Sequence, residues 1–200
     1  MAPASNISKE KRDRYEWLFQ ELNKVLLLQG LSINREGKLI IVEKANTVDE
    51  VDARISGLDR ELYRRHVPDS IRHFCNRELL AKDYSGAVFE ATKGLAEKVR
   101  QITGLTTDGG ELFRTAFCVN HPYLSFNALS NDSEISEFKG LEKLLEALFN
   151  LVRNPIAHTP KINWIVNEKD AFDILTIISF ASKYLDSCFP VDRHAQSDNS

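Results

Sequence analysis

The feature that most constrains the fold is the helical spacing of apolar residues from Pro68 to Cys188. In each segment between turn signals, apolar side chains recur every three or four residues, and this spacing predicts helices that bury one face. The segments begin near Pro68, Asp83, Gly110, Asn131 and Asn167. This part of the chain is therefore predicted to form an all-α bundle.

The first 66 residues carry a different pattern. Apolar residues at helical spacing predict a helix from about Ser8 to Gln29, and Gly30 stands where a helix commonly ends. These apolar residues are Trp17, Leu18, Leu22, Val25 and Leu26. Two short β-rich runs, Leu31–Ile33 and Lys38–Val42, flank a glycine-containing turn, which predicts a small β-hairpin. It is the only clear β signal in the sequence.

A second helix is predicted after the hairpin. Thr47–Glu50 has the pattern of a capping box, in which a hydroxyl and a carboxylate satisfy the free amides at a helix start. The helix should end near Arg65, and its apolar residues form a narrow packing seam made of Val51, Ile55, Leu58 and Leu62. We therefore expect a mainly α chain with a helix, hairpin and helix in residues 1–66, a helical bundle in 67–190 and a disordered polar tail in 191–200.

Charge and cysteine content exclude several classes of protein. A net charge of −3 disfavours a protein that covers nucleic acid by bulk electrostatics, because that mode needs a basic surface. The three cysteines, Cys75, Cys118 and Cys188, stand in apolar contexts and are expected to be reduced core thiols. No Cys/His pattern indicates a metal site, and we expect no cofactor. No apolar run approaches the length of a membrane span, so we expect a cytoplasmic protein without membrane contact.

The stretch from Asn150 to His158 says most about function. An apolar helix is predicted to end on Arg153, Pro155 forces the backbone to change direction, and the histidine follows. Arginine stays charged and pairs with phosphate oxygens, while histidine suits proton transfer near neutral pH. Asn154 adds a neutral hydrogen-bonding group. Arg153, Asn154 and His158 are therefore the candidate catalytic residues, able together to hold a phosphodiester and move a proton.

The spacing of an arginine and a histidine is not specific by itself. Four residues lie between Arg153 and His158, against five between Arg60 and His66 and six between Arg114 and His121, and pairs with such spacings arise by chance for any short motif. Only Arg153 is followed by Asn-Pro at the end of a strongly apolar helix. This context separates it from the other two pairs.

The stretch Arg-Asn-Pro-Ile-Ala-His resembles the signature of the HEPN superfamily (higher eukaryotes and prokaryotes nucleotide-binding domains). Further matching features are Asp83-Tyr84, Ala87, Glu90-Ala91-Thr92-Lys93, Val99-Arg100, Thr103-Gly104-Leu105, Asp108-Gly109 and Phe138-Lys139-Gly140. With them, the region from about Ile71 to Leu185 is similar to one bacterial branch, the Ymh-type proteins of unknown function. Residues 1 to about 66 resemble, less closely, the N-terminal regions of abortive-infection proteins that carry such domains.

The resemblance implies a HEPN-like helical bundle that forms a homodimer, with Arg153 and His158 of both subunits facing one cleft. It also implies metal-independent cleavage of RNA, in which the ribose 2′-hydroxyl attacks the adjacent phosphate, and a role as a toxin or effector in defence against phage. Some members only bind. The alternative function is therefore a non-catalytic dimeric RNA- or protein-binding module of a defence or toxin–antitoxin system, with an antitoxin or another defence protein as its partner.

Each candidate residue also has a purely structural interpretation. Arg153 suits the negative end of a helix dipole, His158 could bond a backbone carbonyl, and Asn154 could cap the turn. Glu90 and Lys93, three residues apart on a helix, form either an exposed ion pair of little energetic weight or a substrate-binding pair beside the RNA cleft. The most basic stretch is either a solvated face or a patch that guides RNA, and comprises Arg60, Arg64, Arg65, His66, Arg72, His73 and Arg77.

Overall fold

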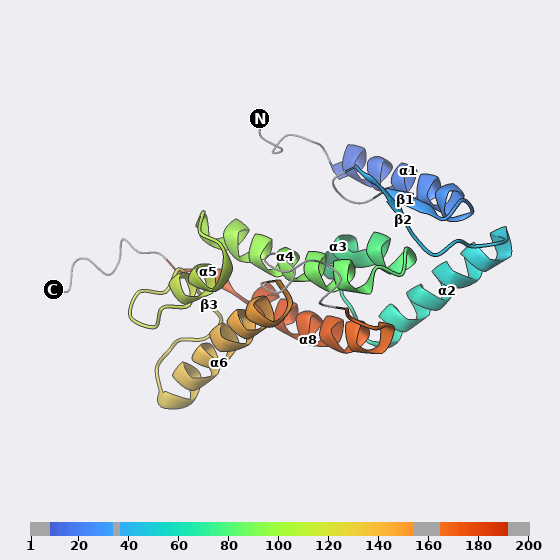
Figure 1. Cartoon of the computed structure of the whole chain (residues 1–200). Coiled ribbons are helices and arrows are strands. Elements are labelled where there is room, and N and C mark those ends of the chain that lie inside the picture. The colour runs from blue at the N-terminus through green and yellow to red at the C-terminus, as the bar shows by residue number, and fades with distance from the viewer. Residues whose placement is uncertain (1–8, 34–36, 154–164, 192–200) are drawn as a thin grey trace. The chain divides into compact units, whose positions relative to one another are not determined.

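The chain is mainly helical, as predicted (Figure 1). The computed structural model describes residues 9–33, 37–153 and 165–191. Its α-helices are α1 (Lys9–Leu27), α2 (Val48–Arg64), α3 (Asp69–Leu80), α4 (Tyr84–Thr103), α5 (Gly109–Ala116), α6 (Asp132–Leu148) and α8 (Glu168–Asp186), and α6 continues into a π-helix, η1 (Phe149–Arg153). The strands are β1 (Leu31–Ile33), β2 (Leu39–Ile41), β3 (Leu124–Ser125) and β4 (Phe189–Pro190).

The chain forms two compact units. Met1–Glu61 and Asn76–Asp83 make up the first, here called the N-terminal unit, and Leu62–Cys75 with Tyr84–Ser200 make up the second, the helical unit. The sequence suggests a boundary between two independently folding domains at residues 66 and 67. Compact units are not the same as independently folding domains, so this boundary stays a prediction.

In the N-terminal unit, α1 packs against the hairpin. The helix ends before Gly30, which has a positive φ of 71°, as the sequence predicted for a glycine at that place. The strands β1 and β2 pair antiparallel with Ser32 opposite Ile40. The buried core consists of Leu27, Ala45 and Val51, with Leu28, Val42 and Ile55 packed around it.

The burial of α1 differs from what its apolar spacing suggests. Trp17, Leu18, Leu22 and Val25 are all exposed, whereas the buried positions are Phe19, Asn23 and Leu27. The helix therefore turns a face that includes a polar asparagine toward the hairpin. The physical reason is that Asn23 makes hydrogen bonds there: its Oδ1 accepts from Ser32 Oγ (3.0 Å) and from Ile33 N (2.7 Å).

The predicted cap of α2 is present with one change. Glu50 N donates to Thr47 Oγ1 (3.1 Å), while the Glu50 carboxylate accepts from Asn46 N (2.8 Å) and not from the Thr47 amide. The bond from the Asn46 amide is the main cause that lowers the pKa of Glu50. Within the predicted seam of α2, Val51 and Leu62 are buried inside the chain, so these two side chains have no free surface for a partner.

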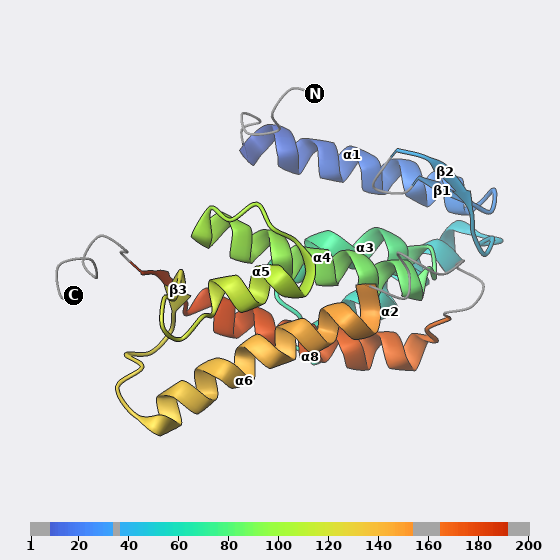
Figure 2. The ribbon, with the colours of Figure 1, turned by 60° about the vertical axis from the view of Figure 1, so that its left-hand side comes forward.

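In the helical unit, α4 is the central element. It packs against α8, α5 and η1, and α6 packs against α5 and α8 (Figure 2). The buried face of α4 is rich in small side chains, as predicted, and includes Ala87, Val88, Ala91, Leu95 and Val99. Gly104, with φ 71°, follows the last turn of the helix.

Aromatic rings fill the space between α5 and α6. The Phe113 and Phe149 rings meet edge to face with centroids 4.9 Å apart, and the Phe117 and Phe138 rings lie 5.2 Å apart. All four side chains are buried, and such pairs contribute about 0.5–1.5 kcal/mol beyond the burial of their area.

Two sequence expectations are wrong in this unit. The sequence shows a clear β signal only at the hairpin of residues 31–42, but Leu124 and Ser125 also pair antiparallel with Pro190 and Phe189. Of the three expected core thiols, Cys75 is buried and Cys188 partly so, whereas Cys118 is exposed. No described helix has the length and apolar character that crossing a bilayer requires.

Candidate functional site

Arg153 stands at the end of a helix, as the sequence predicted, but that end has an unexpected geometry. After Leu148 the α-helix α6 changes into the π-helix η1, which ends on Arg153. The amide of Phe149, at the junction, donates to both Glu146 O and Leu145 O. The Arg153 side chain, Asn154 and His158 lie outside the described residues.

The π-helix is held by buried neighbours. Phe149 and Val152 are buried, and Phe149 packs on Phe113, whereas Leu151 between them is 62% exposed. The backbone of Arg153 is thus attached to the core at the residue before it. π-Helices are rare, and those inside α-helices frequently occur at functional sites; this one follows the last residue of α6 and ends on the arginine that the sequence singled out.

Both described flanks of the segment 154–164 attach to α4. On one side η1 packs against α4. On the other side Val166, which is buried, donates its backbone N–H to Ser85 Oγ in the first turn of α4 (3.0 Å). The described chain is therefore attached to α4 through η1 and again at Val166, and Asn154 and His158 stand between these two elements in the sequence.

Glu90 and Lys93 form an ion pair on α4. Lys93 Nζ lies 3.0 Å from Glu90 Oε1 and 3.1 Å from Oε2, and it also stands over the Phe89 ring, 5.3 Å from the centroid. The Glu90 side chain is only 15% exposed, against 47% for Lys93. The partial burial of the carboxylate distinguishes this ion pair from a fully solvated one, and its part in substrate binding stays a prediction.

The comparisons with known proteins bear on this region of the chain. Residues 65–185 match the sequence profile of a family described as "Protein of unknown function (Hypoth_ymh)". The chain belongs to the Hypoth_ymh family. No significant match was found among curated proteins or among solved structures. The matched region runs from the residue after α2 into the last turn of α8, so the family's shared part includes α4, η1 and the whole Arg153–His158 stretch.

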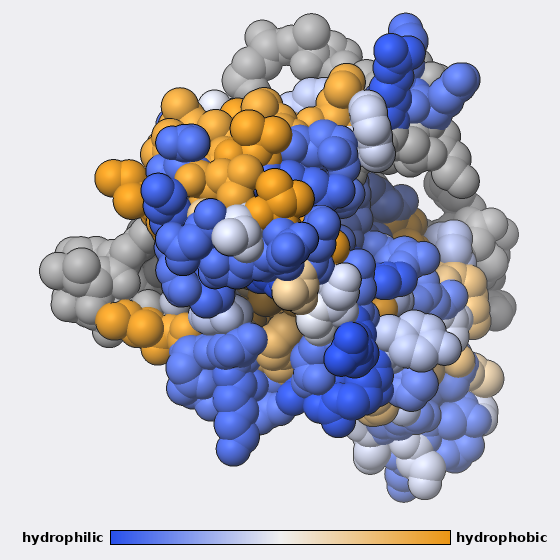
Figure 3. Space-filling view, turned by 90° about the vertical axis from the view of Figure 1, so that its right-hand side faces the viewer, coloured by the Kyte–Doolittle hydropathy of each residue, from blue (hydrophilic) through white to orange (hydrophobic). Residues whose placement is uncertain are grey.

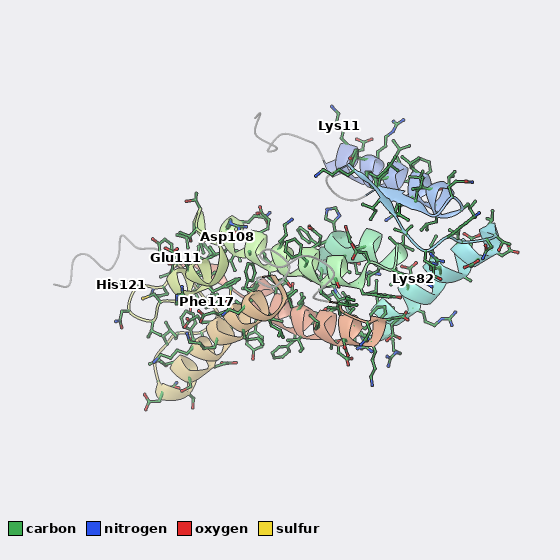
Figure 4. The ribbon with its side chains drawn as sticks, in the orientation of Figure 1. Lys11, Lys82, Asp108, Glu111, Phe117 and His121 are labelled. Carbon is green, nitrogen blue, oxygen red and sulfur yellow. The ribbon has the colours of Figure 1, made fainter. Side chains whose placement is uncertain are left out.

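In this Hypoth_ymh chain, the other two arginine–histidine pairs lie in different surroundings, and one of their arginines has an ion-pair partner. Arg114 forms an ion pair with Glu146 on α6, and His121 is exposed in the loop after α5 (Figure 4). Arg60 is exposed on α2, and His66 is an exposed residue with φ 52° after that helix. The Arg114 guanidinium is thus already paired with the Glu146 carboxylate. Lys143 is the main cause that lowers the pKa of Glu146, and Arg114 lowers it further.

The basic stretch of the sequence is partly neutralised within the helical unit. Arg65 donates to Asp173 Oδ1 (2.8 Å) and to Thr176 Oγ1 (3.2 Å), and its guanidinium lies over the Phe172 ring. Arg72 pairs with Asp69. These contacts give Arg65 and Arg72 structural roles, and an RNA-guiding patch built on the whole stretch stays a prediction.

Sequence reasoning missed the π-turn and the attachment of Val166 to Ser85. No sequence signal identifies a π-turn, because Phe149 to Arg153 suit an α-helix equally well. Within the described part of the chain, no three His, Cys, Asp or Glu side chains gather as metal ligands.

Proposed function

We propose that this chain is a HEPN-type endoribonuclease that cleaves RNA without a metal ion, with Arg153, Asn154 and His158 as its catalytic residues. The observation that carries the proposal is the π-turn that ends on Arg153. A rare helical geometry, anchored by buried Phe149 and Val152, coincides with the motif that resembles the HEPN signature. The family match covers this stretch without assigning it a function.

In the proposed reaction the ribose 2′-oxygen forms a bond to the adjacent phosphorus while the bond from phosphorus to the 5′-oxygen breaks. A histidine takes the proton of the 2′-hydroxyl, and a histidine returns a proton to the leaving 5′-oxygen. The two His158 side chains of a homodimer would supply both functions. Arg153, always charged, would stabilise the negative charge that grows on the phosphate oxygens, and Asn154 would orient the phosphate.

Glu90 and Lys93 would lie beside the bound RNA. Lys93 offers a cation to the phosphate backbone, and Glu90, held 3.0 Å from it, fixes the position of that cation. In this proposal the substrate is RNA, and the biological role is that of a cytoplasmic toxin or effector in bacterial defence against phage. This role rests on the HEPN resemblance.

The proposal is tested by cleavage of mixed RNA in the presence of EDTA. Arg153→Ala and His158→Ala are compared with the wild-type protein and with two controls, Arg60→Ala and His121→Ala, which remove exposed side chains of the same types. We expect His158→Ala to reduce the rate about 10²–10⁴-fold, as loss of a positioned acid or base does, and both controls to keep full activity. Equal cleavage by all variants, or no cleavage by any, would contradict the proposal.

The alternative is a non-catalytic dimeric binding module. In that function Leu151, which is 62% exposed directly beside the motif, would be part of the contact surface. Expression in a bacterial host separates the two functions. A ribonuclease effector should slow growth and His158→Ala should relieve the effect, whereas a binding module should show no difference between the two forms.

A further inference from the structure

The two edges of the hairpin in the N-terminal unit differ in the hydrogen bonds that their outward backbone groups make. On the β1 side, the buried Asn23 of α1 takes the place of a neighbouring strand. Its Oδ1 accepts the N–H of Ile33 (2.7 Å), and its Nδ2 donates to Ile33 O (3.3 Å). The amide side chain, which is both donor and acceptor, thus closes this edge.

Among the described residues, no side chain or strand closes the β2 edge in this way. In an antiparallel pair, residues that exchange hydrogen bonds alternate with residues that do not. Val42 N donates to Gly30 O (2.9 Å), and Ser32 lies opposite Ile40, so the backbone groups of Leu39 and Ile41 point away from β1. Among the described strands none pairs with this outer edge. The open edge ends at Glu43, whose carbonyl accepts from Arg54 Nη1 (3.2 Å).

The side chains along this edge are apolar and exposed. Ile41 is 90% exposed and Leu39 is 62% exposed. They share the outer face of the hairpin with Leu31 and Ile33, which stand opposite them on β1. Figure 3 shows apolar side chains gathered in one broad patch near the top of the view, over α1 and the hairpin. An open edge with apolar side chains is a template for another strand, and an isolated two-stranded hairpin is only marginally stable.

We propose that β2 pairs antiparallel with β2 of a second copy of this chain, about a two-fold axis at Ile40. In this register Leu39 stands opposite Ile41 of the partner subunit, and Ile41 stands opposite the partner's Leu39. Both pairs use the backbone groups that point outward, so each exchanges two hydrogen bonds. The two hairpins become one four-stranded sheet with a continuous apolar outer face.

A second copy fits this edge because the edge is complementary to itself. A two-fold contact brings the same residues together from both sides. Leu39 and Ile41 meet this requirement because both are apolar and both direct their backbone hydrogen-bonding groups outward. Moving the axis to Ile41 would place Leu39 opposite the partner's Glu43, whose carbonyl Arg54 already occupies. The register about Ile40 is therefore the one that this edge favours. The inference is independent of the proposed ribonuclease activity.

The register is tested by disulfide trapping in the full chain with Cys118→Ser and Cys188→Ser. About the proposed axis, Ile40 meets its own copy in a non-hydrogen-bonded pair with Cα atoms about 4.5 Å apart, within the range that a disulfide spans. Leu39 and its own copy lie more than about 8 Å apart, two residues out of register. We expect Ile40→Cys to form a covalent dimer under mild oxidation, at least about tenfold faster than the control Leu39→Cys. Absence of the Ile40→Cys dimer, or a faster Leu39→Cys dimer, would overturn the proposal.

A second measurement does not depend on a cysteine in the strand. Ile41→Lys places a charge on an exposed side chain and should leave the hairpin folded while blocking the contact between edges. In sedimentation, the variant should show about half the mass of the wild-type assembly, since one two-fold interface is lost. Leu22→Lys on α1, also exposed, is the control and should keep the wild-type mass. An unchanged mass of Ile41→Lys would overturn the proposal. It would also be overturned if only a strand of a different protein were found paired with this edge.

Discussion

A tight contact between a glycine of α4 and an aromatic ring of α3 offers a sharp test of the fold. Gly94 of α4 is buried, and a Cβ added there would lie 2.6 to 2.9 Å from three ring atoms of Phe74 on α3. Contacts of a Cβ below 3.0 Å are essentially never seen. At an ordinary helix position, replacement of glycine by alanine stabilises by about 1 kcal/mol. Here the added methyl group would collide with the Phe74 ring, which would have to move from its packed position.

We expect Gly94→Ala to lower the free energy of unfolding. Overpacking of a core costs about 1–3 kcal/mol, and the gain in helix propensity offsets about 1 kcal/mol of it. The net loss is about 1 kcal/mol, which corresponds to a fall in Tm of about 2–4 °C for a chain of this size. Urea unfolding followed by circular dichroism measures it, as a lower midpoint at an unchanged slope.

Gly140→Ala is the matched control for this substitution. Gly140 is an exposed glycine on α6, and an added Cβ there would meet no atom within 4 Å. We expect this variant to be more stable by up to about 1 kcal/mol. Phe74→Ala should also remove the penalty of Gly94→Ala when the two are combined, because the clash needs both partners. Equal stabilisation by the two glycine substitutions would refute the tight contact between Gly94 and the Phe74 ring.

Two further predictions concern a helix cap and the thiols. Asn131→Ala should lower the free energy of unfolding by about 1 kcal/mol in urea, because Asn131 Oδ1 accepts the Glu134 amide at the start of α6 (3.0 Å). Asn131→Asp keeps an acceptor and should cost little. Equal losses of stability for the two variants would contradict the cap. Burial raises the pKa of the Cys188 thiol to about 11, which leaves about one thiolate in a thousand at pH 8. Cys118, which is exposed, should therefore react with iodoacetamide well before Cys188, as peptide mass spectrometry can show, and comparable rates would refute this order.

The elements that could be predicted from the sequence are those with local causes. Asn131 and Asn167 each accept an amide three residues ahead, and such a bond is common where Asn precedes a helix, although Asp108 before α5 makes none. Gly30 and Gly104 adopt positive φ, which glycine allows without strain. Because these causes act within a few residues, the helix order and the hairpin followed from the sequence.

The elements that escaped prediction depend on contacts between distant residues. The pairing of Leu124 with Pro190 joins segments far apart in the chain, and two-residue strands leave no alternating pattern to detect. The burial of Asn23 in place of Leu22 depends on the hydrogen bonds that Ile33 and Ser32 offer. Apolar spacing alone favours the leucine.

For the candidate site, the sequence indicated which arginine matters but not how its backbone is held. The Asn-Pro that follows Arg153 distinguishes it in the sequence, whereas the pairing of Arg114 with Glu146 appears only in three dimensions. Glu90 and Lys93 were correctly expected to meet on one helix face, since residues three apart do so. The greater burial of Glu90 depends on the packing around α4 and could not be predicted from spacing.

The role of α4 determines how a loss of activity should be interpreted. Since η1 and Val166 both attach to it, any change that unfolds α4 would also disturb the chain that carries Arg153 and His158. Gly94→Ala separates the two effects. A protein of ordinary stability, about 5–15 kcal/mol, stays almost fully folded after a loss of about 1 kcal/mol, so this variant should cleave RNA at nearly the wild-type rate. If Arg153→Ala has a higher Tm than Gly94→Ala and yet no activity, the missing guanidinium, and not weakened packing, accounts for the loss.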